Sequence, residues 1–206
     1  MQLHFFWRLS LILLLGFFSN QLSGQSLELM LGHERIFADV QWLKFIDQDR
    51  HWSIFSRTRA TVDYDNQTDL FSGAYLNYTL KNGLGASVIG KIANSGAGAD
   101  AGVHLFKLKP KWMLFALVSA GLKDELEYSW FSIFRFTPKL NDQWKFYSSL
   151  ELFSLFRQGN HLVSVQRLRL GLDHRQFQFG VAGNFTEVGA DWTGRSNLGL
   201  FVRKAF

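Results

Sequence analysis

The sequence contains no cysteine and only two prolines among its 206 residues. Without cysteine there is no disulfide, no thiolate metal site and no cysteine nucleophile. Proline removes a backbone hydrogen-bond donor, so its scarcity suits strands that are paired on both sides. The sequence therefore favours a fold whose strands all have neighbours and whose stability does not depend on disulfides.

Long hydrophobic runs are also missing beyond the first part of the chain. A membrane-spanning helix needs about 20 consecutive apolar residues, and no such run occurs after residue 18. The mean hydropathy is only -0.02, although the chain holds 21 Phe, 7 Trp and 5 Tyr. The apolar residues are therefore interleaved with polar ones, which argues against a helical membrane protein.

The formal net charge is +5. A basic balance can indicate nucleic acid, a charged lumen or contacts with anionic lipid head groups. No nucleic-acid recognition motif accompanies the charge. We therefore expect no nucleic-acid partner.

The first 24 residues have the order of a secretory signal peptide. Residues 1–8 carry His4 and Arg8, residues 9–18 are an apolar run (LSLILLLGFF), and residues 19–24 are small and polar. An apolar core of about ten residues is too short to cross a membrane as a helix. We expect cleavage after residue 24 and one domain over residues 25–206, with a short membrane anchor as the alternative.

From residue 26 onward, apolar and polar residues alternate with a period of two. In residues 143–157, Phe146 and Leu150 share one parity, whereas Lys145 and Glu151 share the other. Alternate residues in a strand point to opposite faces, so this run has an apolar face and a charged face. The same alternation recurs in residues 51–64, 70–80, 84–93, 176–188 and 196–206.

Turns rich in Gly, Asn and Asp separate about twelve such runs, each near the ~9–11 residues that a tilted strand needs to cross a bilayer. The runs are 26–32, 34–46, 51–64, 69–80, 83–93, 99–109, 112–122, 128–139, 143–157, 161–172, 177–188 and 196–206. Two of them, 99–109 and 161–172, change parity, which requires a bulge or a shifted boundary. The sequence predicts an all-β, antiparallel, up-and-down transmembrane β-barrel of about 12 strands, with ten as the alternative because the first run is short.

Two arguments place the apolar faces in lipid. Small and medium side chains would not fill a ring of twelve strands. If the apolar faces pointed inward, Phe55, Tyr75, Phe131, Phe153 and Phe201 would lie in water beside the charges. A soluble secreted barrel or sandwich that binds a ligand is the alternative. The tryptophans favour the membrane barrel, because several lie near the ends of the predicted strands, where aromatic girdles meet the membrane–water interfaces. These are Trp42, Trp52, Trp112, Trp130 and Trp144.

The chain ends on Phe206, after Leu198, Leu200, Val202 and Lys204 at alternate positions. This ending resembles the C-terminal targeting strand of Gram-negative outer-membrane β-barrel proteins. Many of those strands carry a second aromatic residue two positions before the last, where this chain has lysine. The resemblance implies an integral outer-membrane protein of a Gram-negative bacterium, with Phe206 as assembly signal and the barrel assembly machinery as a partner.

Basic residues outnumber acidic ones on the faces that would line the lumen. Arg57 and Arg59 share one face, as do Arg167 and Arg169, and rows of arginine favour anions in pores. In this feature the chain resembles the twelve-stranded anion-preferring porins that pass acidic sugars. We predict a small passive pore for anionic solutes or a structural barrel plugged by arginine–carboxylate pairs. The predicted lumen residues are Arg57, Arg59, Lys91, Arg135, Lys145, Glu151, Arg167, Arg169 and Arg203.

One element of the sequence could indicate an enzyme. His51 and Ser53 share a face in a His-x-Ser order, which resembles an element of lipid A deacylases and would make the chain a lipid-modifying hydrolase. In that family the element lies toward the C-terminus of a smaller barrel, whereas here it opens an early strand. Asp63 shares the face but lies too far along the strand to orient His51. We therefore expect no enzyme and no cofactor, and the scattered histidines predict no metal site.

Overall fold

The computed structural model describes residues 24–122 and 126–206. The predicted signal peptide, residues 1–24, lies outside these ranges except for its last residue. No helix within these ranges has the length and apolar character that a membrane crossing requires.

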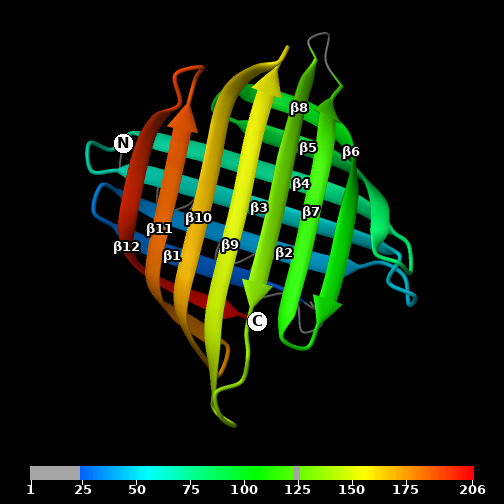
Figure 1. Ribbon diagram of the computed structural model, residues 1–206, viewed down its shortest axis with the longest axis vertical. Helices are drawn as coiled ribbons and strands as arrows, with labels where there is room; N and C mark the ends of the chain where they lie inside the picture. Colours follow the sequence, from blue (N-terminus) through cyan, green and yellow to red (C-terminus); the bar gives the residue numbers. More distant parts are fainter. Residues whose placement is uncertain (1–23, 123–125) are drawn as a thin grey trace, which may run out of the picture.

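The described residues form twelve strands, each paired antiparallel with the next, and β1 also pairs with β12 so that the sheet closes into a barrel. In Figure 1, β7 to β12 cross in front of β1 to β5 at a large angle, which is the strand tilt of a closed barrel. Every predicted run coincides with a strand, and the bounds differ by at most three residues. The strands are β1 (Ser26–Gly32), β2 (Arg35–Phe45), β3 (Trp52–Asp63), β4 (Thr68–Thr79), β5 (Leu84–Ala93), β6 (Gly96–Lys109), β7 (Trp112–Gly121), β8 (Glu127–Phe136), β9 (Trp144–Arg157), β10 (Asn160–His174), β11 (Phe177–Val188) and β12 (Thr193–Ala205).

The two runs with a parity change have different explanations. The pairing of β10 with β9 shifts register between His161 and Val163, which confirms an irregularity there. By contrast, β6 pairs without a shift with both β5 and β7. Its predicted boundary was wrong instead, because the strand begins at Gly96.

The apolar faces point outward. In β1, Leu27, Leu29 and Leu31 are 47%, 41% and 58% exposed, whereas Glu28 and Met30 between them are buried. Every other strand also exposes at least one large apolar side chain, and β2, β3, β7 and β9 contribute one each, namely Val40, Trp52, Val118 and Leu150. A barrel with an apolar exterior and a polar interior is the arrangement of a membrane barrel and not of a soluble one.

Aromatic residues gather near the strand ends. Trp52, Trp112 and Trp144 are the first residues of β3, β7 and β9, and these three strands start at the same end of the barrel. Trp42 lies near that end of β2, whereas Trp130 lies toward the opposite end of β8. Amphipathic rings at these positions suit the two membrane–water interfaces.

The middle of the lumen is filled, which corrects the expectation of an interior too wide to fill. One buried cluster consists of Met30, Phe37, Tyr147, Ala182 and Phe201. A second consists of Tyr75, Ile89, Leu117, Phe131 and Ile133, with Phe55 and Phe153 packed against it. Small and medium side chains alone would leave this space open, but phenylalanine, tyrosine and arginine reach far enough to meet across the ring.

Glycine allows a close approach between β10 and β11. Gly171 of β10 and Gly180 of β11 are paired in the register. A Cβ on Gly180 would lie 2.1 Å from the carbonyl oxygen of Leu170 and 2.6 Å from the Cα of Gly171. No other residue fits there without a shift of the backbone.

Candidate functional site

Two cavities lie in the lumen, one toward each end. We call the end that holds Ser26 and Ala205 the proximal end, and the end of the β1–β2 turn the distal end. The distal chamber has a volume of about 300 Å³ and is lined by residues such as Arg35, Arg59 and Asn197. The proximal chamber has a volume of about 240 Å³ and is lined by residues of the opposite strand ends. The two chambers share no lining residue.

Charged side chains cross the lumen between the two chambers. The Arg57 guanidinium donates to the Asp39 carboxylate (Nη2–Oδ2, 2.5 Å) and to Glu151 (Nη1–Oε2, 2.5 Å). Arg57 lies on β3 and Glu151 on β9, which are six places apart in a ring of twelve strands and therefore face each other. Asp39 is only 1% exposed and Arg57 only 4%. This ionic bridge therefore connects opposite walls of the barrel, and its side chains are buried from solvent.

Glu151 collects two further arginines. Its Oε1 accepts hydrogen bonds from Arg59 Nη2 and from Arg167 Nη1, the latter at 2.6 Å. Arg59 Nε also lies 3.7 Å from Asp39 Oδ1. We call Asp39, Arg57, Arg59, Glu151 and Arg167 the ion-pair layer. It contains three guanidinium groups and two carboxylates, so the layer has a net charge of +1.

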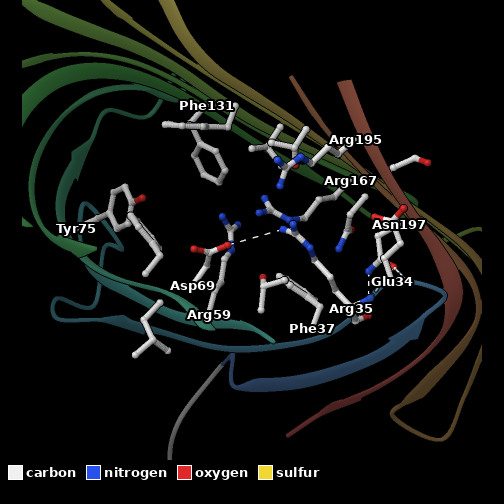
Figure 2. Close-up of a pocket in the computed structure, with 18 residues that line it drawn as sticks. Glu34, Arg35, Phe37, Arg59, Asp69, Tyr75, Phe131, Arg167, Arg195 and Asn197 are labelled. Carbon is white, nitrogen blue, oxygen red and sulfur yellow. Dashed lines mark hydrogen bonds and ion pairs between the residues drawn. The ribbon is translucent and has the colours of Figure 1, made fainter. Parts of the chain in front are cut away.

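The ion-pair layer presents arginine to the distal chamber. Figure 2 shows the chamber with Tyr75 and Phe131 on the side away from Asn197. Its acidic lining residues are Glu34 and Asp69, and Asp69 reaches Arg35 only at 3.8 Å with its own side chain 76% exposed. The four arginines of the lining are Arg35, Arg59, Arg167 and Arg195. Basic groups thus outnumber acidic ones in the chamber as they do in the sequence.

The backbone beside the chamber is held by one side chain. Asn197 Oδ1 accepts hydrogen bonds from the backbone N–H groups of Glu34 (3.1 Å) and Arg35 (3.2 Å). Asn197 Nδ2 donates to the Arg35 carbonyl at 3.0 Å. The β1–β2 turn is thereby tied to β12, and the base of Arg35 is fixed at the rim of the distal chamber.

The other predicted lumen residues are dispersed. Arg169 pairs with Glu28 (Nη2–Oε1, 2.8 Å) inside the barrel, and Lys91 pairs with Asp100 (2.7 Å) on the wall. Arg135 and Arg203 line the proximal chamber. Lys145 is exposed and lies at the proximal start of β9, where its register partner is Asp173. The structure therefore brings Arg57, Arg59, Glu151 and Arg167 together and leaves the other five outside the layer.

His51 and Ser53 have different partners. The His51 ring lies 3.7 Å from Asp47 (Nδ1–Oδ2) and 6.0 Å from the Tyr78 ring, in the turn between β2 and β3. Ser53 is buried in the lumen, where its Oγ accepts a hydrogen bond from Asn77 Nδ2 at 3.4 Å. No hydrogen bond joins His51 to Ser53 within the described part of the chain.

Asp47 organises this turn. Its carboxylate accepts hydrogen bonds from the backbone N–H groups of Trp52 (2.6 Å) and His51 (3.0 Å). Desolvation raises the pKa of the Asp47 carboxyl, but these backbone donors outweigh it and hold the pKa below the ordinary value of an aspartate. The sequence did not predict this acid as a partner of His51, because the turn folds back on itself.

A buried polar chain in the proximal half was also missed. Thr79 Oγ1 lies 2.9 Å from His104 Nε2, and Ser87 Oγ lies 2.8 Å from His104 Nδ1. Ser87 Oγ donates to Asn77 Oδ1 at 2.7 Å. The sequence showed His104 only as one of several scattered histidines. The alternation of β6 places His104 on the inward face, which could have indicated a buried polar role. Its hydrogen-bond partners could not be predicted, because they lie on two other strands, β4 and β5.

Phe206 follows the last strand. Its backbone N–H donates to the carbonyl of Gln25 at 2.9 Å, and the Lys204 ammonium lies 4.7 Å from its ring centroid. The two ends of the barrel wall are therefore tied together at the proximal end. The role of Phe206 as an assembly signal stays a prediction.

No family model matches the sequence, and no curated protein matches it either. Solved structures do match the fold. A KdgM porin in complex with disordered oligogalacturonate has a TM-score of 0.53 at 6% identity, covering 89% of this chain and 99% of that one. The NanC porin has a TM-score of 0.54 at 9% identity, covering 89% and 98%. LpxR from Salmonella typhimurium has a TM-score of 0.51 at 9% identity, covering 89% and 100%.

Identities this low show a common fold and nothing finer. The matches nevertheless extend over nearly the whole length of each known protein. They agree with the closed ring of twelve antiparallel strands. The chain therefore has the fold of the outer-membrane β-barrel proteins.

Proposed function

We propose that the protein is an integral outer-membrane β-barrel of a Gram-negative bacterium that forms a narrow, anion-preferring passage. The distal chamber carries the proposal, because its lining holds four arginines and two acids. Arginine side chains that line a pore attract anions and repel cations. The chamber would be the place where a solute first meets the barrel.

The ion-pair layer would be the constriction of this passage. Arg57 and Glu151 bridge opposite walls, so a solute can move between the chambers only if this bridge rearranges. Arg59 and Arg167 are shared between Glu151 and the distal chamber. An anion in that chamber would compete with Glu151 for the same two guanidinium groups and thereby loosen the bridge.

The solute class we propose is a small acidic saccharide. The KdgM porin with the same fold was solved in complex with oligogalacturonate, an acidic sugar chain. Arginine forks match carboxylates in a planar, bidentate way. Phe131 and Tyr75 add apolar ring faces to the same lining.

Planar-bilayer recordings test the passage. With purified protein and a salt gradient, we expect a reversal potential that indicates anion preference. The double variant Arg59→Glu, Arg167→Glu should shift it toward cation preference. Arg175→Gln removes a charge from the exposed β10–β11 turn and serves as the control. A reversal potential that the double variant leaves unchanged would contradict the role of the distal arginines.

A structural barrel is the second candidate, and the ion-pair layer itself favours it. Glu151→Gln separates the two, because it removes the carboxylate that holds three arginines together. If the layer is a closed constriction, this variant conducts several-fold more than the parent protein. If both proteins insert into bilayers and neither conducts, the barrel is structural and the proposed passage is wrong.

We propose no hydrolase role for the chain, although LpxR shares its fold. His51 and Ser53 face different surroundings, one in a turn and one in the lumen. We also propose that residues 1–24 direct export and are removed, and that the strand ending at Phe206 is recognised by the barrel assembly machinery.

A further inference from the structure

Two arginines meet at the proximal chamber without a carboxylate. Arg135 Nη2 and Arg203 Nη2 both donate to Gln41 Oε1, at 3.0 Å and 3.2 Å. Gln41 is neutral, and its own Nε2 donates to Asp39 at 2.7 Å. The other side-chain hydrogen bonds of Arg203 within residues 24–122 and 126–206 go to hydroxyl groups, those of Ser26 (2.7 Å) and Tyr147 (3.1 Å). Two positive charges therefore share one amide oxygen.

The nearest acid is engaged elsewhere. Glu28 is the register partner of Arg203, but its carboxylate binds Arg169 at 2.8 Å. Within the described ranges, neither Arg135 nor Arg203 forms an ion pair, and the Nε atom of each has no hydrogen-bond partner. Arg203 is only 6% exposed. Buried charges are normally paired, because an unpaired one loses its hydration without compensation.

The rest of the proximal chamber combines an apolar, aromatic wall with polar groups such as Asn77, Thr79 and His104. No aspartate or glutamate occurs in its lining. The apolar wall is formed by Phe45, Phe55, Phe106, Met113 and Phe115. A cavity of about 150 Å³ holds benzene, so this chamber of about 240 Å³ has room for about ten non-hydrogen atoms. A cavity with an apolar wall and two convergent cationic groups is a ligand site by its chemistry.

We infer that the proximal chamber binds a small arylcarboxylate. Its carboxylate lies between Arg135 and Arg203 and accepts their unused N–H groups, and its ring packs against Phe55 and Phe115. Each arginine fork can engage a carboxylate bidentately, and the phenylalanine rings provide edges and faces for a further ring. The site does not depend on the distal chamber, and it exists whether or not the barrel conducts.

Isothermal titration calorimetry on the purified, detergent-solubilised barrel tests this site with benzoate as the probe. We expect one benzoate per chain. Acetate has the carboxylate without the ring, and benzyl alcohol has the ring without the charge, so each should bind at least tenfold more weakly. Arg135→Gln and Arg203→Gln should each weaken benzoate binding at least tenfold. A heat-modifiable gel shift shows that each variant is folded.

Arg175→Gln is the matched control, because it removes one positive charge at the proximal end outside the chamber. It should bind benzoate as the parent protein does. The inference is overturned if benzoate does not bind, or if it binds both Arg variants and the parent protein equally. Acetate binding as tightly as benzoate would also overturn it, since the ring would then have no role. Benzoate binding does not depend on conductance. A bilayer without conductance would therefore refute the proposed passage, whereas a failed titration would refute this binding site.

Discussion

Arg57 and Arg135 both point into the barrel, but their surroundings differ. Arg57 lies between two carboxylates, Asp39 and Glu151, at 2.5 Å from each. Among the residues that the structure describes, the Arg135 side chain has one hydrogen bond, to the neutral amide of Gln41. Removal of one partner from a buried ion pair leaves the other charge uncompensated, whereas removal of an unpaired charge leaves nothing behind.

We therefore expect the two methionine variants to change stability in opposite ways. Arg57→Met should lower the free energy of unfolding by about 3 to 5 kcal/mol, because the buried Asp39 carboxylate loses its ion-pair partner at 2.5 Å and keeps Arg59 at 3.7 Å. Arg135→Met should leave it equal to that of the parent protein or higher. Urea unfolding in lipid vesicles without added carboxylate measures both. A large loss in Arg135→Met would mean that this arginine already has a partner.

The sequence predicted which side chains face inward but not which of them meet. Alternation assigned Arg57, Arg167 and Glu151 to the lumen, because parity is a local property of each strand. The bridge from Arg57 to Glu151 joins residues 94 positions apart. Its partners depend on how far the barrel brings opposite walls together, which no local pattern contains. The filling of the lumen by Phe37 and Tyr147 escaped prediction for the same reason.

At the scale of the elements, the strands follow from the sequence almost completely. Period-two alternation and the Gly, Asn and Asp turns gave all twelve runs, because each strand has one lipid face and one lumen face. The largest errors in the bounds, three residues each, lie at the start of β6, the end of β8 and the start of β12. The alanines and glycines of β6 blur its parity, and its start at Gly96 was missed by three residues.

The paired glycines of β10 and β11 give a test at this scale. Gly180→Ala places a Cβ 2.1 Å from the Leu170 carbonyl oxygen. We expect the free energy of unfolding to fall by about 1 to 3 kcal/mol, as for other overpacked sites. Gly90→Ala on β5 is the control, because no atom lies within 4 Å of its Cβ position. Equal stability of the two variants would mean that the wall yields freely at Gly180.

The β2–β3 turn predicts a dependence on pH. The pKa of Asp47 is lowered, so its hydrogen bonds to His51 and Trp52 contribute stability above the pKa of an unfolded aspartate, about 4, and lose it as the pH falls through the lower folded value. Asp47→Ala should therefore unfold at a lower temperature than the parent protein at pH 7. The difference should shrink in strong acid. A difference that is the same at both pH values would exclude the ionised carboxylate as its source.

At the scale of the whole molecule, the exterior determines where the barrel can exist. Leu200 is 65% exposed in the middle of β12, on the outward face. Arginine near the bilayer midplane costs about 2 to 4 kcal/mol, so we expect Leu200→Arg to lower folding stability in lipid by this amount. Leu140→Arg is the control, since Leu140 is exposed in the loop between β8 and β9.

Equilibrium folding into vesicles measures both variants. The control should fold like the parent protein, because the loop lies outside the strands that would cross the hydrocarbon. If Leu200→Arg were instead neutral, or if the parent protein stayed dispersed without detergent, the outward faces would not contact acyl chains.

The pairing of β1 with β12 has a consequence for the order of folding. Gly32 pairs with Gly199, so the seam joins residues more than 160 positions apart in the chain. Until residues 193–205 have been synthesised, both margins of the growing sheet carry open backbone donors and acceptors, which invite pairing with other chains. A nascent chain halted before that stretch cannot complete its ring in a bilayer. Insertion must therefore await the last strand, and the cell must keep the unfinished polypeptide from aggregating until then.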